Sequence, residues 1–172
     1  MLSSVIGWGI AWAIGLSGVF YLHPMLGWPI LGIIGGFTVA RTLRMVGALR
    51  RPADRRFIVM IWLTGAIISA ETAGYVILRG WLIAAAFGGL ATGFLVFGKR
   101  GLPRTIVLTA GWCVGGALGA VFIAQAGSTL APMLASTIGG LSAWLVCWGI
   151  GGIITGLVAG GLISFRAGLW RP

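Results

Sequence analysis

The chain has very few residues that can support acid–base or metal chemistry. Its 172 residues include two acidic residues, one histidine and two cysteines. His23, Asp54 and Glu71 are separated by long apolar stretches, so one chain cannot assemble a catalytic triad, a carboxylate pair or a two-histidine metal site from them. We therefore expect a protein that is not an enzyme and binds no metal through its own side chains.

Charged residues are also scarce, which excludes an ordinary water-soluble fold. Charged residues make up 8% of the chain, hydrophobic residues make up 59%, and the mean hydropathy is +1.06. So few polar groups cannot cover a surface that faces water, and the sequence predicts an integral membrane protein. Cys113 and Cys147 lie within apolar runs, where we interpret them as small buried hydrophobic residues.

Apolar runs predict six membrane spans. Their approximate ranges are 2–22, 28–44, 57–78, 80–97, 105–126 and 140–163. The first run covers about 31 Å as a helix, enough to cross the hydrocarbon core. Short links at 23–27 and near Arg79 predict antiparallel neighbours, and the longer link at 127–139 has room for a short interfacial helix. We expect one all-α transmembrane domain over 1–172, built as three antiparallel hairpins, with all prolines in links or near span ends.

Basic residues predict the orientation of the chain. In this threading only Arg79 lies outside, and the other eleven lie inside: Arg41, Arg44, Arg50, Arg51, Arg55, Arg56, Lys99, Arg100, Arg104, Arg166 and Arg171. This bias places both termini in the cytoplasm, in a cytoplasmic (inner) or photosynthetic-type membrane. The net charge of +10 then arises from short loops beside the spans, which makes a nucleic acid an unlikely partner. The set Arg41, Arg44, Arg50, Arg51, Arg55 and Arg56 is expected to contact anionic lipid or an acidic partner.

Glycines and tryptophans indicate a tightly packed bundle with an internal repeat. The 31 glycines recur at i and i+4 within most spans, a spacing that lets helix backbones approach closely. A tryptophan precedes a glycine pair by seven residues three times, at Trp28 with Gly35-Gly36, Trp81 with Gly88-Gly89, and Trp144 with Gly151-Gly152. The pattern predicts three superposable hairpins over 1–44, 57–100 and 105–166, with the glycine pairs at equal depths. Chance recurrence in a glycine-rich chain is the alternative.

The tryptophans have two interpretations. Trp28 and Trp81 open their predicted spans, which favours an aromatic belt at the outer interface. Trp8 with Trp12, and Trp144 with Trp148, are spaced i,i+4 on one helix face. These four residues either pack in the bundle or line a pocket for a ring-shaped ligand.

Glu71 is the one acidic residue predicted within a span. A buried carboxylate is costly, so we expect its side chain to face protein or an internal cavity, with Arg79, Ser69 or Thr72 as polar partners. Glu71 has three interpretations. It is a buried structural group whose hydrogen bonds are satisfied, or a proton, cation or substrate site, or a contact to another subunit. His23, in a short external turn, is a solvated loop residue or an axial ligand to a pigment or haem.

The sequence favours two classes of function. The first is a non-catalytic integral membrane subunit or scaffold of a larger complex, packing against pigment, quinone or lipid, with other membrane subunits or a second copy of itself as partners. The second is a small-molecule or ion binding or transport module with Glu71 in its site. No particular cofactor is indicated by the residues.

Overall fold

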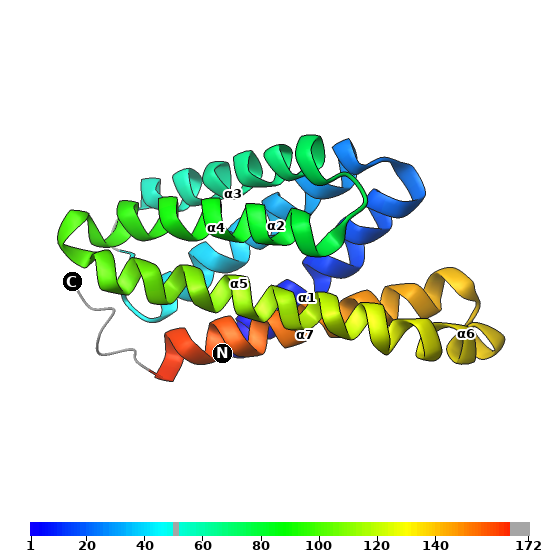
Figure 1. The fold of residues 1–172 in the computed structure, drawn as a ribbon. Coiled ribbons are helices and arrows are strands. Elements are labelled where there is room, and N and C mark those ends of the chain that lie inside the picture. The colour runs from blue at the N-terminus through cyan, green and yellow to red at the C-terminus, as the bar shows by residue number, and fades with distance from the viewer. Residues whose placement is uncertain (50–51, 166–172) are drawn as a thin grey trace.

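The computed structural model describes residues 1–49 and 52–165, without the side chains of residues 52, 53, 164 and 165, and this part of the chain is helical with no strand. The elements are α1 (Leu2–Ser17), continued by a π-helical turn η1 (Gly18–Leu22), then α2 (Pro24–Met45), α3 (Pro52–Ala73), α4 (Ile77–Phe97), the 3-10 turn η2 (Lys99–Gly101), α5 (Leu102–Gln125), α6 (Gly127–Ile138) and α7 (Gly140–Phe165), as Figure 1 shows.

Within the described residues, six helical segments are long and apolar enough to cross a membrane. They are Leu2–Leu22, Pro24–Met45, Asp54–Ala73, Ile77–Phe97, Lys99–Gln125 and Gly140–Ile163. The prediction of an all-helical chain with six spans is confirmed at this level. The predicted link at 127–139 does hold a helix, α6, which is too short to span a bilayer.

Two predicted boundaries are wrong. The third helix ends at Ala73 rather than near residue 78, because Gly74 takes a positive φ of 55° that ends the helix. As a result Arg79 is the third residue of α4 and is not the link itself. The second helix starts at Pro24, four residues earlier than predicted, so that Pro29 lies inside α2.

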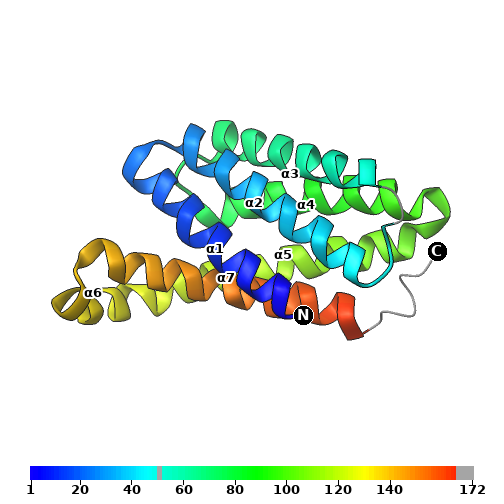
Figure 2. The same cartoon turned by 180° about the vertical axis from the view of Figure 1, so that it is seen from behind.

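The long helices form a closed ring. They run alternately between the two ends of the molecule, as the two opposite views show (Figures 1 and 2). Each packs against the long helix before and after it in the chain, and α7 packs against α1. The short α6 packs against α7 and α5 at one end. We call this the far end, and we call the opposite end, which carries the exposed side chains of Arg41, Arg44, Arg55, Arg56, Lys99 and Arg100, the basic end.

Glycines bring neighbouring helices into backbone contact. A Cβ added at Gly36 would lie 2.8 Å from the Cα of Val59, and one at Gly89 would lie 2.8 Å from the Cα of Thr109. Between α7 and α1, a Cβ at Gly156 would lie 2.7 Å from the Cα of Val5. These spacings are too short for any side chain, so glycine fixes the distance between the helices.

The three glycine pairs do not have the same surroundings. Gly35 faces the ring of Trp8, and Gly88 faces the ring of Trp62, a tryptophan of the preceding helix in each case. Gly151 instead faces Ile123 and the carbonyl oxygen of Gly119. The internal repeat therefore stays a prediction.

Candidate functional site

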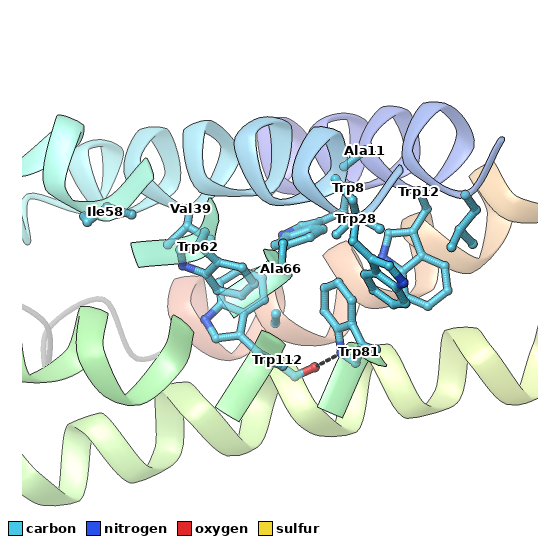
Figure 3. Packing of buried hydrophobic residues seen from close by; sticks show 14 of the residues in the cluster. Trp8, Ala11, Trp12, Trp28, Val39, Ile58, Trp62, Ala66, Trp81 and Trp112 are labelled. Atoms are coloured by element: carbon cyan, nitrogen blue, oxygen red, sulfur yellow. Dashed lines mark hydrogen bonds between the residues drawn. The ribbon is translucent and has the colours of Figure 1, made fainter. Parts of the chain in front are cut away.

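Five tryptophans fill the middle of the ring of helices (Figure 3). We call them the central tryptophan cluster: Trp8, Trp12, Trp62, Trp81 and Trp112, each 0% exposed. Trp8, Trp62 and Trp112, from α1, α3 and α5, form a triangle with ring centroids 5.3, 5.3 and 5.5 Å apart. Trp81 of α4 lies 4.9 Å from Trp8, and Trp12 lies 5.1 Å from Trp81. The cluster therefore joins four of the six long helices around one aromatic centre.

Glycines provide the space that these rings occupy. A Cβ at Gly35 would lie 2.6 Å from the Trp8 ring, and one at Gly88 would lie 2.9 Å from the Trp62 ring. Gly116 gives the same close approach to Trp81. The indoles are thus held in notches on the facing helices and are part of the packed interior.

The aromatic-belt interpretation of Trp28 and Trp81 is wrong. Both side chains are 0% exposed. The indole N–H of Trp28 donates to the carbonyl oxygen of Gly74 at 2.8 Å, and that of Trp81 donates to the carbonyl oxygen of Trp112 at 2.9 Å. Trp81 therefore links α4 to α5, and Trp28 links α2 to the turn after α3. The i,i+7 pattern along one helix does not reveal such links.

Six other buried polar atoms have no hydrogen-bond partner among the described residues. The indole N–H groups of Trp8, Trp12, Trp62 and Trp112 are buried without a hydrogen-bond partner, as are the hydroxyls of Ser4 and Thr92. A buried polar group without a partner costs about 1 to 3 kcal/mol. Six such groups in one small interior are a departure from ordinary packing, and the sequence pattern gave no signal of them.

A second aromatic group lies at the far end. We call it the far-end cluster: Phe20, Tyr21, Tyr75, Trp144 and Trp148. Trp148 is buried and stacks on Phe20 and Trp144, with centroids 5.5 and 5.8 Å away. No ring contact between described residues joins the two clusters. The predicted ligand pocket of Trp8, Trp12, Trp144 and Trp148 stays a prediction: the four residues belong to one hydrophobic core, in which the two pairs make no direct ring contact with each other.

The predicted polar site around Glu71 is not formed. Glu71 is exposed in the last turn of α3, so the prediction that its side chain faces protein or an internal cavity is wrong. The cause is Gly74, which ends α3 close to Glu71 and leaves the carboxylate near the end of the bundle, where it needs no buried partner. Gly74 directly follows the last helical residue, and a glycine in that position is the sequence signal for a helix end.

No hydrogen bond or ion pair joins Glu71 to any of its three proposed partners in the described part of the chain. Arg79 is exposed, and no ion pair joins it to Glu71 within the described part of the chain. Thr72 is exposed and its hydroxyl donates to the carbonyl oxygen of Ile68 at 2.7 Å. Ser69 is buried, and its hydroxyl contacts the carbonyl oxygens of Gly65 at 2.8 Å and Gly80 at 2.7 Å. Ser69 therefore links α3 to α4 and is structural.

His23 is the N-cap of α2. Its side chain is exposed, and its Nδ1 accepts a hydrogen bond from the backbone N–H of Met25 at 3.2 Å. This bond satisfies one of the free N–H groups at the start of the helix. A pigment or haem iron can therefore reach only Nε2 without breaking the cap.

The arginines assigned to lipid or partner contact lie at the basic end. Arg41, Arg44, Arg55 and Arg56 are exposed, and the guanidinium of Arg55 lies 5.2 Å from the centre of the Phe37 ring. Arg50 and Arg51, like Arg166 and Arg171, lie outside the described residues. The exposed guanidinium groups are free to bind phosphate or carboxylate groups beside the end of the bundle.

The interior as a whole offers hydrogen-bond donors and aromatic rings rather than proton-transfer groups. Apart from the indole nitrogens, the buried polar side chains of the described residues are hydroxyls: Ser4, Thr38, Thr42, Ser69, Thr92, Thr105 and Thr155.

Comparison of the chain with protein-family models, with curated proteins and with solved structures finds no match.

Proposed function

We propose that this protein is a non-catalytic integral membrane subunit that packs against other components of a membrane complex, with pigment, quinone or lipid on its outer surface. The observation that supports this most is the content of the ring of helices. It is filled by the chain's own tryptophans, and no Asp, Glu, His, Lys or Arg of the described residues is buried there. Because the interior is packed with the chain's own apolar side chains, we place the functional contacts on the outside of the bundle.

We propose that the basic end lies in the cytoplasm, with both termini on that side, in an inner or photosynthetic-type membrane. The support is the clustering of exposed arginine and lysine at one end, against Arg79 alone at the other among the described residues. Arg41, Arg44, Arg55 and Arg56 then meet anionic headgroups.

We further propose that the bundle arose as three hairpins in tandem, α1 with α2, α3 with α4, and α5 with α7. Trp8, Trp62 and Trp112 meet at its centre, one from the first helix of each hairpin. In each hairpin, one of the glycines that pack on the next hairpin lies against the residue three positions before the neighbour's tryptophan: Gly36 on Val59, Gly89 on Thr109 and Gly156 on Val5. In this register Trp148 matches Trp28 and Trp81, in place of Trp144.

The far-end cluster is the surface that we assign to partner contact. Phe20, Tyr21 and Tyr75 are 43%, 53% and 55% exposed. Phe20 and Tyr21 contact the buried ring of Trp148, and Tyr75 contacts Phe20. Exposed aromatic side chains on a rigid base are enriched in protein interfaces. The exposed face of α6, with Met133 71% exposed, lies at the same end and extends this surface.

The proposal is tested by what purifies with the protein. The chain is tagged at native expression level, extracted in mild detergent and analysed by native mass spectrometry. We expect bound membrane subunits or pigment, and their loss in the double variant Tyr21→Ala, Tyr75→Ala. Phe94→Ala, which truncates an aromatic residue of similar exposure on the flank of α4, is the control and should retain them. A wild-type chain that purifies alone would contradict the proposal.

The alternative, a binding or transport module that uses Glu71, keeps less support. Its carboxylate is exposed in the last turn of α3 and belongs to no buried polar group. The variant Glu71→Gln, which removes the charge, tests this alternative.

A further inference from the structure

The unpaired polar atoms of the interior need an explanation. Indole N–H is a donor and cannot accept, so Trp8, Trp12, Trp62 and Trp112 bring four hydrogens that no protein atom accepts. The hydroxyls of Ser4 and Thr92 add one hydrogen each. Each hydroxyl oxygen can also accept, but the two hydroxyls offer fewer acceptor positions than the six groups have hydrogens, so these unpaired groups have an excess of donors.

Four of these groups lie on the side of the tryptophan triangle toward the basic end. In Figure 3 the indole nitrogens of Trp62 and Trp112 lie on the side of their rings that faces Ile58 and Val39, toward the basic end. Ser4 is one helical turn before Trp8 on α1, on the same face and in the same direction. Thr92 is one turn after Gly88, which faces Trp62, and α4 also runs toward the basic end. Ser4 and Thr92 therefore lie on the side to which the two N–H groups point.

An anion satisfies this arrangement better than water does. A water molecule accepts two hydrogen bonds but brings two hydrogens of its own, so it leaves the excess of donors unchanged. A monoatomic anion accepts several N–H and O–H bonds and brings none. The positive edges of the indole rings and the arginines of the basic end lower the energy of a negative charge here, and no carboxylate of the described residues is buried nearby.

The packing also limits the size of the ligand. Gly35 and Gly88 hold the rings of Trp8 and Trp62 within 2.6 and 2.9 Å of a Cβ position on the facing helix. A flat organic ring cannot enter such an interior without separating the helices. A monoatomic ion displaces much less volume than such a ring.

We propose that a halide ion binds inside the bundle between the tryptophan triangle and the level of Ser4 and Thr92, held by the indole N–H groups of Trp62 and Trp112 and by the two hydroxyls. Trp12, which lies on the other side of Trp8 in Figure 3, takes no part in this site. The anion supplies the acceptor that these four groups lack.

Thermal unfolding of the purified chain tests this site. Melting is measured in sodium chloride or bromide and in sodium gluconate of the same ionic strength. At a halide concentration 100-fold above Kd, we expect a rise in Tm of about 5 to 10 °C in the wild type. Thr92→Val removes one hydroxyl with little change of shape and should lose most of this rise. In gluconate this variant should melt at or above the wild-type Tm, because it no longer buries an unpaired hydroxyl.

Two matched controls keep the test specific. Thr64→Val removes an exposed hydroxyl that donates to the carbonyl oxygen of Met60, and it should keep the full halide effect. Saturable quenching of tryptophan fluorescence by iodide, competed by chloride, should weaken in Trp112→Phe and persist in Trp28→Phe, whose lost N–H donated to Gly74. A wild-type Tm that is equal in halide and gluconate, or an equal halide shift in Thr92→Val and Thr64→Val, would overturn the proposal.

Discussion

The two aromatic clusters use the same residue type in opposite ways. The five rings of the central cluster are 0% exposed, and glycines on facing helices hold several of them. In the far-end cluster only Trp148 is buried, and Phe20, Tyr21 and Tyr75 leave 43%, 53% and 55% of their surface open. Glycines on other helices leave room for core rings: a Cβ at Gly35 would lie 2.6 Å from Trp8, and one at Gly88 would lie 2.9 Å from Trp62. Gly127 lies opposite the half-buried Trp144 at a looser 3.3 Å.

The largest expected effect separates the clusters by their contribution to stability. Trp8→Ala removes the ring that contacts Trp62, Trp81 and Trp112, and it should lower the free energy of unfolding by about 3 to 5 kcal/mol, through lost burial and the cavity left behind. Trp144→Ala removes a half-buried ring of the far-end cluster and should cost much less. Reversible unfolding in mixed detergent micelles measures both. Equal losses would contradict the distinction between a structural centre and a surface cluster.

The next effect tests the glycine contacts. Gly152→Ala places a methyl group against the backbone carbonyl of Trp8, which cannot move without moving α1. Such overpacking should cost about 1 to 3 kcal/mol. Gly161→Ala is the control on the same helix, because an added Cβ there meets nothing within 4 Å, and it should be neutral or slightly stabilising. A Gly152→Ala variant as stable as Gly161→Ala would show that α1 and α7 are not packed this closely.

A smaller effect distinguishes paired from unpaired indoles inside the central cluster. Trp81→Phe loses the hydrogen bond to the carbonyl oxygen of Trp112, whereas Trp12→Phe loses an N–H that has no protein partner. Both variants lose similar ring area, so Trp81→Phe should be less stable by about 1 kcal/mol. The same unfolding assay measures the difference. A reversed order would mean that the N–H of Trp12 has a partner that the described residues do not supply.

The sequence was sufficient to predict the helices, and it was insufficient where a contact joins distant parts of the chain. Six spans follow from apolar runs, because each helix satisfies its own backbone and needs only a lipid environment. The burial of Trp28 and Trp81 depends on Gly74, Trp112 and Gly116, which lie on other elements, so helix position alone placed both residues wrongly at the interface.

The candidate sites were predicted less well for the same kind of reason. Glu71 was given a deep position because the run 57–78 was read as one helix through Gly74, although glycine is a frequent helix end. The unpaired indoles of the central cluster had no sequence signal, since a hydrogen bond that is absent depends on every neighbouring element. The basic residues were easier to place, because every second loop of a bundle of antiparallel helices lies at the same end.

The smallest expected effect concerns Glu71, at the far end of α3. Its side chain is exposed and forms no ion pair with Arg79 in the described structure, so Glu71→Gln should change stability by less than about 0.5 kcal/mol. Components that purify with the wild type should stay bound. Ser69→Ala, two residues earlier, removes a buried hydroxyl that links α3 to the carbonyl oxygen of Gly80 and should cost about 1 kcal/mol. If Glu71→Gln instead leaves the fold intact but abolishes uptake or binding of a soluble ligand, the protein is a transport or binding module, and the subunit proposal fails.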